Sequence, residues 1–427
     1  MEALEHDYQE FTELLTEEEL YDLAVQYGAA EQRDRKLPIR IFFWLMILSA
    51  GQPTLRGGLF QLAAFFVAAL TQLFPLHQAI TLTKMALSKR MSCTSWFFFR
   101  AVYNRLLWRY QKDLPASQCN LFSRFREAFA LDSTVTRVVA ALEKCFQSVH
   151  KGKAAVKLNV RFSLKNLAAD KIQATSGRRH DSRFAGITNQ PGILYLFDLG
   201  YWAFTRLKKI IDAKSFFVSR LKSSCDPLIV EVKDQNWQHL VGQRLSQIIG
   251  LLKPDQALDV QVKLSKAKKP RFDEEIRLVG LFYEDIWRFY ITNLFETAFT
   301  PQIIYDLYRQ RWSIEIFFNQ IKHLLHLEHL ISRNKNGIMV EVYSALIFHL
   351  LTRIIIALAA KKTHQPVETF SFSRSFDLVR AFLSTHLGEL LRATHRTLIC
   401  FLQHLVEAVA RMGLKDQASP SETMNYA

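Results

Sequence analysis

The amino-acid sequence predicts an α/β fold with a mixed β-sheet at its centre, a further β-rich segment, and helical regions at both ends. Between residues 125 and 222, apolar and polar residues alternate with a period of two, which is typical of half-buried strands. Between residues 300 and 326, apolar residues recur every three or four positions, which is typical of a helix packed on a core. A chain of 427 residues is long enough for roughly two to four domains.

The N-terminal region, residues 1 to about 122, is predicted to be helical. Thr16 precedes three glutamates and fits the N-cap of a helix. Residues 80–110 have the outline of a helix-turn-helix, with the turn at 91–93 and the second helix capped by Thr94 or Ser95. The cations predicted to contact DNA phosphates here are Lys84, Lys89, Arg90 and Arg100. A basic helical hairpin without a role in DNA binding fits the same pattern.

The central region begins with three segments that fit consecutive antiparallel strands, at residues 128–139, 156–164 and 171–178. Asp132 lies inside the first of them, directly after four apolar residues. A carboxylate in an apolar strand is costly unless a partner stabilises it. Asp132 is therefore either a functional residue or a cap for the turn at 133–134.

The fourth strand is predicted to be central, because residues 193–197 are apolar throughout. Asp198 lies at its carboxyl end, and Gly200 frees the backbone to turn. A helix at 201–211 and a strand at 216–222 follow. Between residues 222 and 300, four more segments are strand-like, and Lys263, Lys266, Lys268, Lys269 and Arg271 form a basic cluster. This cluster fits a DNA-contacting loop or a solvated hairpin tip.

The stretch 300–326 is predicted to form one long helix, because Pro301 suits the first turn and neither Pro nor Gly recurs until Gly337. Four polar residues at spacings of three, four and seven share one stripe at the border of the apolar face. They are Tyr308, Arg311, Glu315 and Lys322. Any two of them fit a solvated i,i+4 pair, whereas all four together indicate a groove beside the core.

This quartet, Tyr-x2-Arg-x3-Glu-x6-Lys, resembles the signature helix of a family of bacterial insertion-sequence transposases with a DDE active site. Leu-Asp-Ser-Thr at Asp132 and Asp-x-Gly-Tyr at Asp198 are similar to its other two catalytic segments, so the resemblance spans roughly residues 125–325. Leu199 departs from the pattern, because Arg is frequent at that position.

The resemblance implies a ribonuclease-H-like mixed-sheet core with a β-rich insertion. In that fold the first and fourth strands lie side by side, which would bring Asp132 and Asp198 together, with Glu315 reaching them from its helix. The three carboxylates would be catalytic and would hold two divalent ions, Mg²⁺ or Mn²⁺, since hard oxygen ligands suit these metals. Arg311 and Lys322 would contact the DNA backbone, as would Arg220 and Lys222 of the strand at 216–222. Tyr308 would hydrogen-bond a phosphate oxygen or stack on a displaced base.

The predicted organisation has four parts. Residues 1–122 form a helical DNA-binding region, 123–222 together with 296–360 the catalytic domain, 223–295 the β-rich insertion, and 361–427 a helical C-terminal region. The predicted activity is cleavage at transposon ends followed by strand transfer to target DNA. The predicted partners are double-stranded DNA, in the form of terminal inverted repeats and target, and a second copy of the chain in a homodimer on DNA.

The composition agrees with a polyanionic partner, because 55 Lys and Arg against 40 Asp and Glu give a net charge of +15. The five cysteines form no Cys-x2-Cys pair, and we expect buried thiols in a reducing compartment, the bacterial cytoplasm. Apolar runs at 57–83 and 347–360 are interrupted by polar residues, so they are predicted to be buried helices and not membrane spans.

Two other functions remain open from the sequence. One is a nuclease of the same fold that cleaves DNA without joining strands. The other is a DNA-binding protein whose catalytic site has decayed. A membrane protein is a more distant alternative, disfavoured by the interrupted apolar runs.

Overall fold

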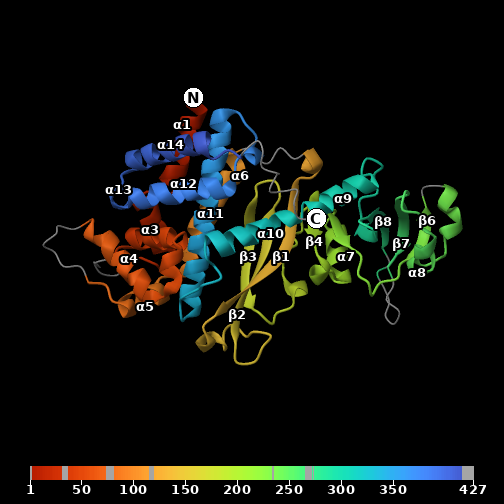
Figure 1. Cartoon of the computed structure of the whole chain (residues 1–427), viewed down its shortest axis with the longest axis horizontal. Helices are drawn as coiled ribbons and strands as arrows, with labels where there is room; N and C mark the ends of the chain where they lie inside the picture. Colours follow the sequence, from red (N-terminus) through yellow and green to blue (C-terminus); the bar gives the residue numbers. More distant parts are fainter. Residues whose placement is uncertain are drawn as a thin grey trace.

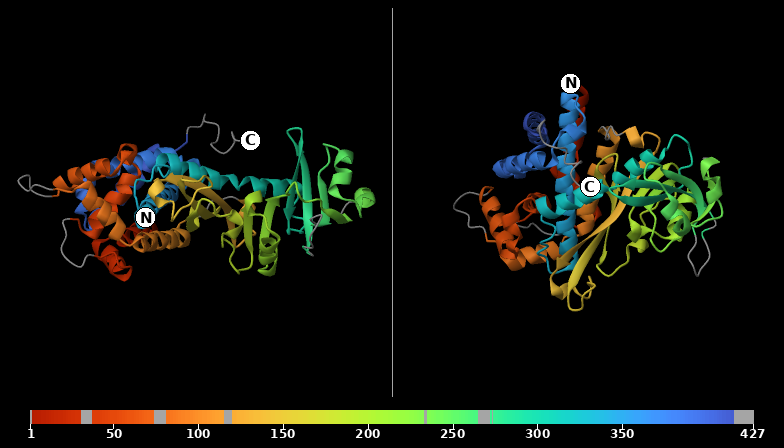
Figure 2. Two further views of the ribbon diagram at one scale, coloured as in Figure 1. Left: turned by 90° about the horizontal axis from the view of Figure 1, so that it is seen from below. Right: turned by 45° about the vertical axis from the view of Figure 1, so that its right-hand side comes forward.

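The computed structural model describes residues 2–30, 37–73, 81–114, 120–232, 235–264, 272 and 274–415. Several predicted features lie outside the described residues: most of the basic cluster, the C-terminal tail and one cysteine (Lys266, Lys268, Lys269, Arg271, 416–427 and Cys119). Figure 2 shows an elongated molecule, with the helical regions from both ends of the chain on one side and the β-rich segment on the other.

A single nine-stranded sheet runs through the centre of the described chain, in the order β3-β2-β1-β4-β5-β9-β8-β7-β6 (Figure 1). Its strands are β1 (Glu127–Val138), β2 (Ala154–Ser163), β3 (Ala168–Ser176), β4 (Ile193–Phe197), β5 (Phe216–Arg220), β6 (Leu228–Val232), β7 (Leu258–Lys263), β8 (Glu275–Tyr283) and β9 (Ile286–Thr292). The period-two segments of the sequence therefore form strands as predicted.

The first five strands have the ribonuclease-H-like arrangement. β1 pairs antiparallel with β2 and β2 with β3, whereas β1, β4 and β5 are parallel neighbours. Every residue of β4 is buried, which explains its uninterrupted apolar sequence. Leu131 of β1 lies opposite Phe197 of β4, so the residues that follow them, Asp132 and Asp198, lie at one edge of the sheet.

The β-rich segment extends this sheet. β9 pairs antiparallel with β5, and β8, β7 and β6 continue outward from it. A short helix, α8 (Leu245–Ile248), and the side of β7 and β8 that faces it enclose a core shared with α7 (Phe204–Asp212). The chain thus returns to the catalytic half through strand pairing, as the sequence predicts for residues 290–294.

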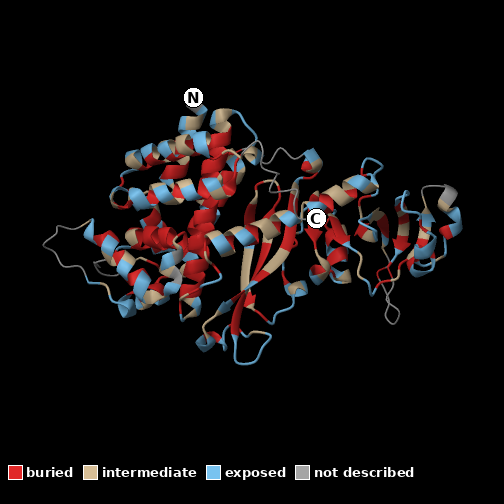
Figure 3. Ribbon diagram, viewed as in Figure 1, coloured by how far each residue is buried: buried red, intermediate tan, exposed pale blue. Residues whose placement is uncertain are grey.

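The helical regions from the two ends of the chain pack together around one central helix, α11 (Lys335–Thr363), which Figure 3 shows as almost wholly buried. The helices that surround it are α1 (Glu2–Glu13), α2 (Glu17–Gln26), α3 (Ile39–Ala50), α4 (Leu59–Thr71), α5 (Lys84–Cys93), α6 (Trp96–Asp113), α12 (Phe372–Thr385), α13 (Leu387–Leu391) and α14 (His395–Met412). α6 and α14 make the broadest contacts with α11, so N- and C-terminal residues share one core.

Among the described helices, α11 alone is long and apolar enough to cross a membrane by length and composition. Its most apolar stretch is 89% buried inside the protein, which is typical of a core helix and agrees with the predicted burial of residues 347–360. The prediction was less accurate for α4, because Phe60 is 70% exposed and only one side of that helix packs on the core.

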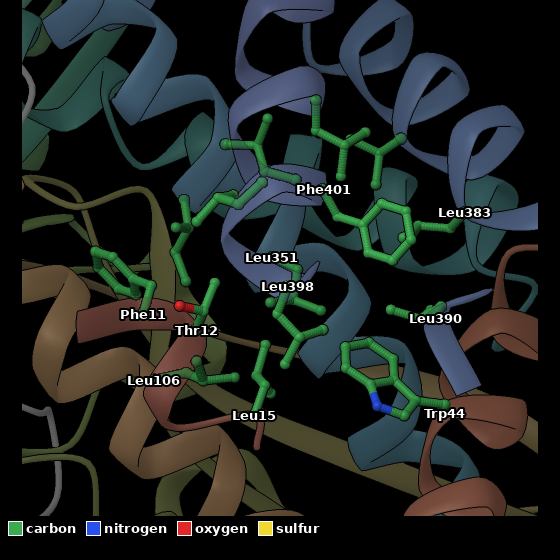
Figure 4. Close-up of a pocket in the computed structure, with 15 residues that line it drawn as sticks. Phe11, Thr12, Leu15, Trp44, Leu106, Leu351, Leu383, Leu390, Leu398 and Phe401 are labelled. Carbon is green, nitrogen blue, oxygen red and sulfur yellow. The ribbon is translucent and has the colours of Figure 1, made fainter. Parts of the chain in front are cut away.

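An apolar cavity of about 60 Å³ lies inside this helical core (Figure 4). Phe11, Leu106, Leu351 and Leu398 line it together with other apolar side chains from both ends of the chain. Its lining contains no carboxylate, imidazole or ammonium group, so it is a gap in packing and offers no chemistry.

The predicted burial of the cysteines was wrong for three of the four that are described. Cys93, Cys145 and Cys400 are exposed, and only Cys225 is buried. Cys93 ends helix α5 and Cys145 lies in a turn before β2, positions where the chain meets solvent.

The predicted single helix over 300–326 is interrupted twice. α9 (Pro301–Arg309) is capped by Thr300, and α10 (Trp312–Asn319) follows after a tightened turn in which Arg311 and Ile314 bond to residues three positions back. A π-helical turn, Gln320–Leu324, then widens the helix. His349 and Arg353 of α11 both donate hydrogen bonds to Oε1 of Gln320, at 2.9 and 3.3 Å, which fixes the start of this turn.

Candidate active site

Three carboxylates approach one face of the sheet. In β1, Ala128 and Ala130 pack in the core beneath the helices, and alternation places Asp132 on that same face. Leu196 of β4 belongs to the same core, so Asp198, two residues later in extended backbone, follows its direction. Helix α10 packs over β1 and carries Glu315 (Figure 1).

The electrostatics of Asp132 reflect this convergence. The pKa of Asp132 is raised to about 6; burial is the largest cause, and the negative charges of Glu315 and Asp198 act in the same direction. A hydrogen bond of 2.7 Å from the backbone N–H of Ser133 and the charge of Arg311 act in the opposite direction. A carboxyl group with these neighbours gains from any cation placed among them.

The guanidinium group of Arg311 is the cation that the structure places there. One terminal nitrogen lies 2.6 Å from Oε1 of Glu315, and the other lies 3.5 Å from Oδ2 of Asp132. Burial lowers the pKa of Arg311, but Tyr308, Glu315 and Asp132 together raise it above its ordinary value. Arg311 therefore bridges two of the three carboxylates from the same helical segment that carries Glu315.

The donor set fits a hard divalent cation. It consists of carboxylate oxygens on one face of a sheet edge, and a guanidinium group already stands in as the positive charge between two of them. As the side chains lie, no group of three or more His, Cys, Asp or Glu residues within the described ranges is close enough to coordinate an ion. Arg311 occupies the space between Asp132 and Glu315, so a metal ion held by these two carboxylates would compete with its guanidinium group.

A groove of about 240 Å³ opens beside Asp198. Cationic and aromatic side chains line it: Arg220, Tyr283, Arg288, Tyr290, Tyr305, Tyr308, Arg309, Arg311 and Trp312. Tyr308 is 8% exposed and packs on Tyr290 with ring centroids 5.1 Å apart, and burial raises its pKa to about 12. Tyr308 and Arg311 of the predicted quartet thus reach the groove, while Lys322 lies half-buried on the π-helical turn.

The two cations predicted on the strand at 216–222 have different environments. Arg220 is exposed and lines the groove beside Asp198. Lys222 donates a hydrogen bond of 3.0 Å to the carbonyl of Trp202 and lies 5.2 Å from the centroid of its ring. Lys222 therefore connects the segment after β5 to the turn before α7. The sequence pattern does not indicate this structural contact.

Two helices are present in this region, α5 and α6, and they are joined at residues 94–95. The predicted position of the turn was wrong, because residues 91–93 form the last turn of α5. Lys84 and Lys89 are exposed, and the guanidinium of Arg100 lies over the rings of Trp96 and Phe97. The prediction that Arg90 contacts DNA phosphates was wrong. Its side chain is buried over the ring of Phe42, 5.2 Å from the centroid, because it lies on the inner face of α5.

The sequence analysis missed a residue next to the site, Asp181, in a 3₁₀ turn (Asp181–Arg183) between β3 and β4. Its Oδ1 accepts hydrogen bonds from Oγ of Ser133 at 2.9 Å and from Nζ of Lys157 at 3.0 Å. The available signal was a single acidic residue in an otherwise basic connection, Arg-Arg-His-Asp-Ser-Arg.

Comparison with known proteins finds one matching family, described as "Transposase DDE domain", over residues 123–351. The chain is 27% identical over 271 residues to a probable transposase for insertion sequence element IS5377 of Geobacillus stearothermophilus, covering 62% of this chain and 67% of that protein. It is 22% identical over 316 residues to the transposase for insertion sequence element IS231F of Bacillus thuringiensis subsp. israelensis, covering 62% and 64%.

Among solved structures, a piggyBac transposase synaptic complex with hairpin DNA aligns with a TM-score of 0.46 and 9% sequence identity. That alignment covers 96% of this chain and 86% of the other. The chain therefore spans about two thirds of the curated relatives' lengths and most of this structure's chain.

Proposed function

Because the chain belongs to the family of transposases with a DDE domain, we propose that it cleaves DNA at the ends of a mobile element and joins the 3′ ends to target DNA. Its direct partner is then double-stranded DNA, and its site of action is the bacterial nucleoid. The observation that carries the proposal is the convergence of Asp132, Asp198 and Glu315 on one face, with a cation between two of them.

The proposed roles follow from the donor atoms. Asp132, Asp198 and Glu315 would hold two Mg²⁺ or Mn²⁺ ions, whose chemistry would be to activate an oxygen nucleophile and to stabilise the leaving oxygen of a displacement at phosphorus. The chain itself orients the DNA. Arg220 and Arg288 line the groove that begins at Asp198, and their proposed role is to bind DNA phosphates, for which Arg288 would exchange its ion pair with Glu284.

Arg311 has two proposed positions in this scheme. Before metal binds, it neutralises Glu315 and Asp132. With a metal ion held by those carboxylates, the planar guanidinium group of Arg311 would be free to bind a phosphate beside the groove with two parallel hydrogen bonds. Tyr308, packed next to it, limits how far the side chain can swing.

Replacing Glu315 with Gln tests the proposal. We expect cleavage of a cognate end in Mg²⁺ to fall at least about a thousandfold, since a metal ligand is lost, with binding of the end nearly unchanged. Glu296→Gln is the control, because Glu296 is exposed and its partner is Arg124, away from the carboxylates. A Glu315→Gln protein that cuts at the normal rate would rule out this metal site.

Two further measurements address the finer parts of the proposal. Precut ends and a plasmid target distinguish a transposase, which joins the strands, from a nuclease, which leaves them free. The mass of the complex with a terminal repeat in solution reports whether two copies of the chain hold the DNA, as the family resemblance implies.

A further inference from the structure

A fourth carboxylate, that of Asp181, lies near the end of the β1–β4 pairing that carries Asp132 and Asp198. It approaches from the face of the sheet opposite to Glu315. Neighbouring residues of a strand point to opposite faces, so Ser133 points away from the side of Asp132. The Oγ of Ser133 donates a hydrogen bond of 2.9 Å to Oδ1 of Asp181. The backbone N–H of the same serine donates one of 2.7 Å to Oδ1 of Asp132. Ser133 thus connects the two carboxylates through the sheet.

Asp181 is itself firmly held. Nζ of Lys157, on the adjacent strand β2, lies 3.0 Å from Oδ1 of Asp181 and 2.9 Å from the carbonyl of Arg179. The side chain of Lys157 is only 11% exposed, so this ion pair is shielded from solvent. The 3₁₀ turn that carries Asp181 is therefore fixed to β2 as well as to β1.

The same turn also contacts the segment that carries Asp198. A Cβ atom at Gly200 would lie 3.5 Å from Oδ2 of Asp181, so the carboxylate lies directly against the turn Leu199–Tyr201. Buried Arg206 of α7 donates to the carbonyl of Tyr201 at 2.8 Å, and to the carbonyls of Ser182 and Phe184 at 3.0 Å each. One guanidinium group therefore joins the turn after Asp198 to the turn of Asp181.

We propose that Asp181 is a positioning residue, which fixes the orientation of Asp132 through Ser133 and its spacing from Asp198 through the turn at 199–201. The inference rests on the proposed function, because it assigns those aspartates to metal binding. Ligating carboxylates must be held within about half an ångström of their productive geometry. Partners outside the ligand set that orient them change metal affinity by about 10- to 100-fold when removed.

The experiment measures Mn²⁺ affinity by calorimetry without DNA, and then the kcat and KM for end cleavage. Asp181→Ala is expected to weaken Mn²⁺ binding about tenfold or more and to lower kcat similarly, with KM for the DNA end unchanged. Asp181→Asn is expected to restore most of both values, because its amide oxygen still accepts from Ser133.

Asp170→Ala is the matched control. Asp170 forms a similar half-buried pair with Arg161 on the same face of the sheet, but it does not contact Ser133 or the turn at 199–201. Its removal is expected to leave Mn²⁺ affinity and kcat unchanged. Ser133→Ala removes only the hydroxyl link, so it tests the inference even if Asp181→Ala does not fold, and it is expected to weaken Mn²⁺ binding in the same direction.

Glu315→Gln separates this inference from the proposed function. Loss of Mn²⁺ binding in that variant supports the metal site itself. With the metal site so supported, normal Mn²⁺ affinity in both Asp181→Ala and Ser133→Ala would overturn the positioning role alone. An equal loss in Asp170→Ala would overturn it too, since the effect would then be a general one on the sheet.

Discussion

Two arginine–carboxylate clusters lie along the same sheet, one in the β-rich segment and one at the catalytic edge, and they differ in how completely they are paired. Nε and a terminal nitrogen of Arg277 donate to the two oxygens of Asp259, at 2.7 and 2.8 Å. Its third nitrogen donates to the carbonyl of Leu294 at 2.8 Å, and its side chain is only 2% exposed. Each of the three nitrogens of this guanidinium group therefore has a hydrogen-bond partner.

The cluster around Arg311 is incomplete by comparison. Each terminal nitrogen meets a different carboxylate, one of them at 3.5 Å, and buried Nε has no hydrogen-bond partner among the described residues. Unsatisfied buried polar groups are costly, so they persist where function requires them. The pair formed by Arg277 and Asp259 is therefore bidentate, whereas the contact of Arg311 with Asp132 and Glu315 is the one that a metal ion would replace under the proposed function.

The largest expected effect comes from breaking the complete cluster. Asp259→Ala leaves the guanidinium of Arg277 buried without its partner, so we expect a loss of about 3–5 kcal/mol in the free energy of unfolding. Urea denaturation measures it, and Asp255→Ala, at an exposed position of the same segment, is the control. A loss below 1 kcal/mol would mean that the pair at β7 and β8 does not stabilise the fold.

A smaller change in the free energy of unfolding, a gain instead of a loss, is expected when Asp132 is replaced. The pKa of Asp132 in the folded protein is about 6, above its ordinary value, so the native state binds more protons than the unfolded state between about pH 4 and pH 6. The contribution of Asp132 to the free energy of unfolding is therefore fully present below that window and is lost as the pH rises through it.

Asp132→Asn does not titrate, so in metal-free buffer it should gain up to about 3 kcal/mol relative to wild type between pH 4 and pH 7. Thermal unfolding at the two pH values, in the presence of a chelator, measures the difference. Parallel pH profiles of stability for the two proteins would show that folding does not raise the pKa of Asp132. The carboxylates of Asp132 and Asp259 would then not differ in the sign of their contribution to stability.

The smallest expected effect is on Mn²⁺ affinity, when the contact of Arg311 with Asp132 and Glu315 is removed. Arg311→Gln removes the cation that competes with metal, so Mn²⁺ should bind about tenfold more tightly, or about 1.4 kcal/mol, in the absence of DNA. Arg309→Gln is the control, because Arg309 is exposed and lies over Tyr305 in the same groove. Unchanged or weaker Mn²⁺ binding in Arg311→Gln would contradict the exchange.

The sequence was sufficient for the strands and for the chain positions of the proposed catalytic residues. Alternation of apolar and polar residues located most of the strands, and an uninterrupted apolar run located β4. Asp132 and Asp198 follow apolar runs, and the family resemblance made them the proposed catalytic residues. The sequence was not sufficient to predict which Lys and Arg side chains are exposed and which pack against the protein. Arg90 and Lys222 have the same local character as Arg220, yet the first packs on Phe42 and the second on Trp202, because each faces inward once its element docks.

What the sequence by itself determined is therefore most of the helices and strands and the chain positions of the proposed catalytic residues, since periodicity and chain direction are local properties. Only the tertiary structure decided which charges meet. It interrupted the helix around Glu315, placed Arg311 between two carboxylates, and brought Asp181 beneath Ser133. These contacts join segments far apart in the chain, and their distances depend on how the helices and the sheet pack, which no local pattern specifies.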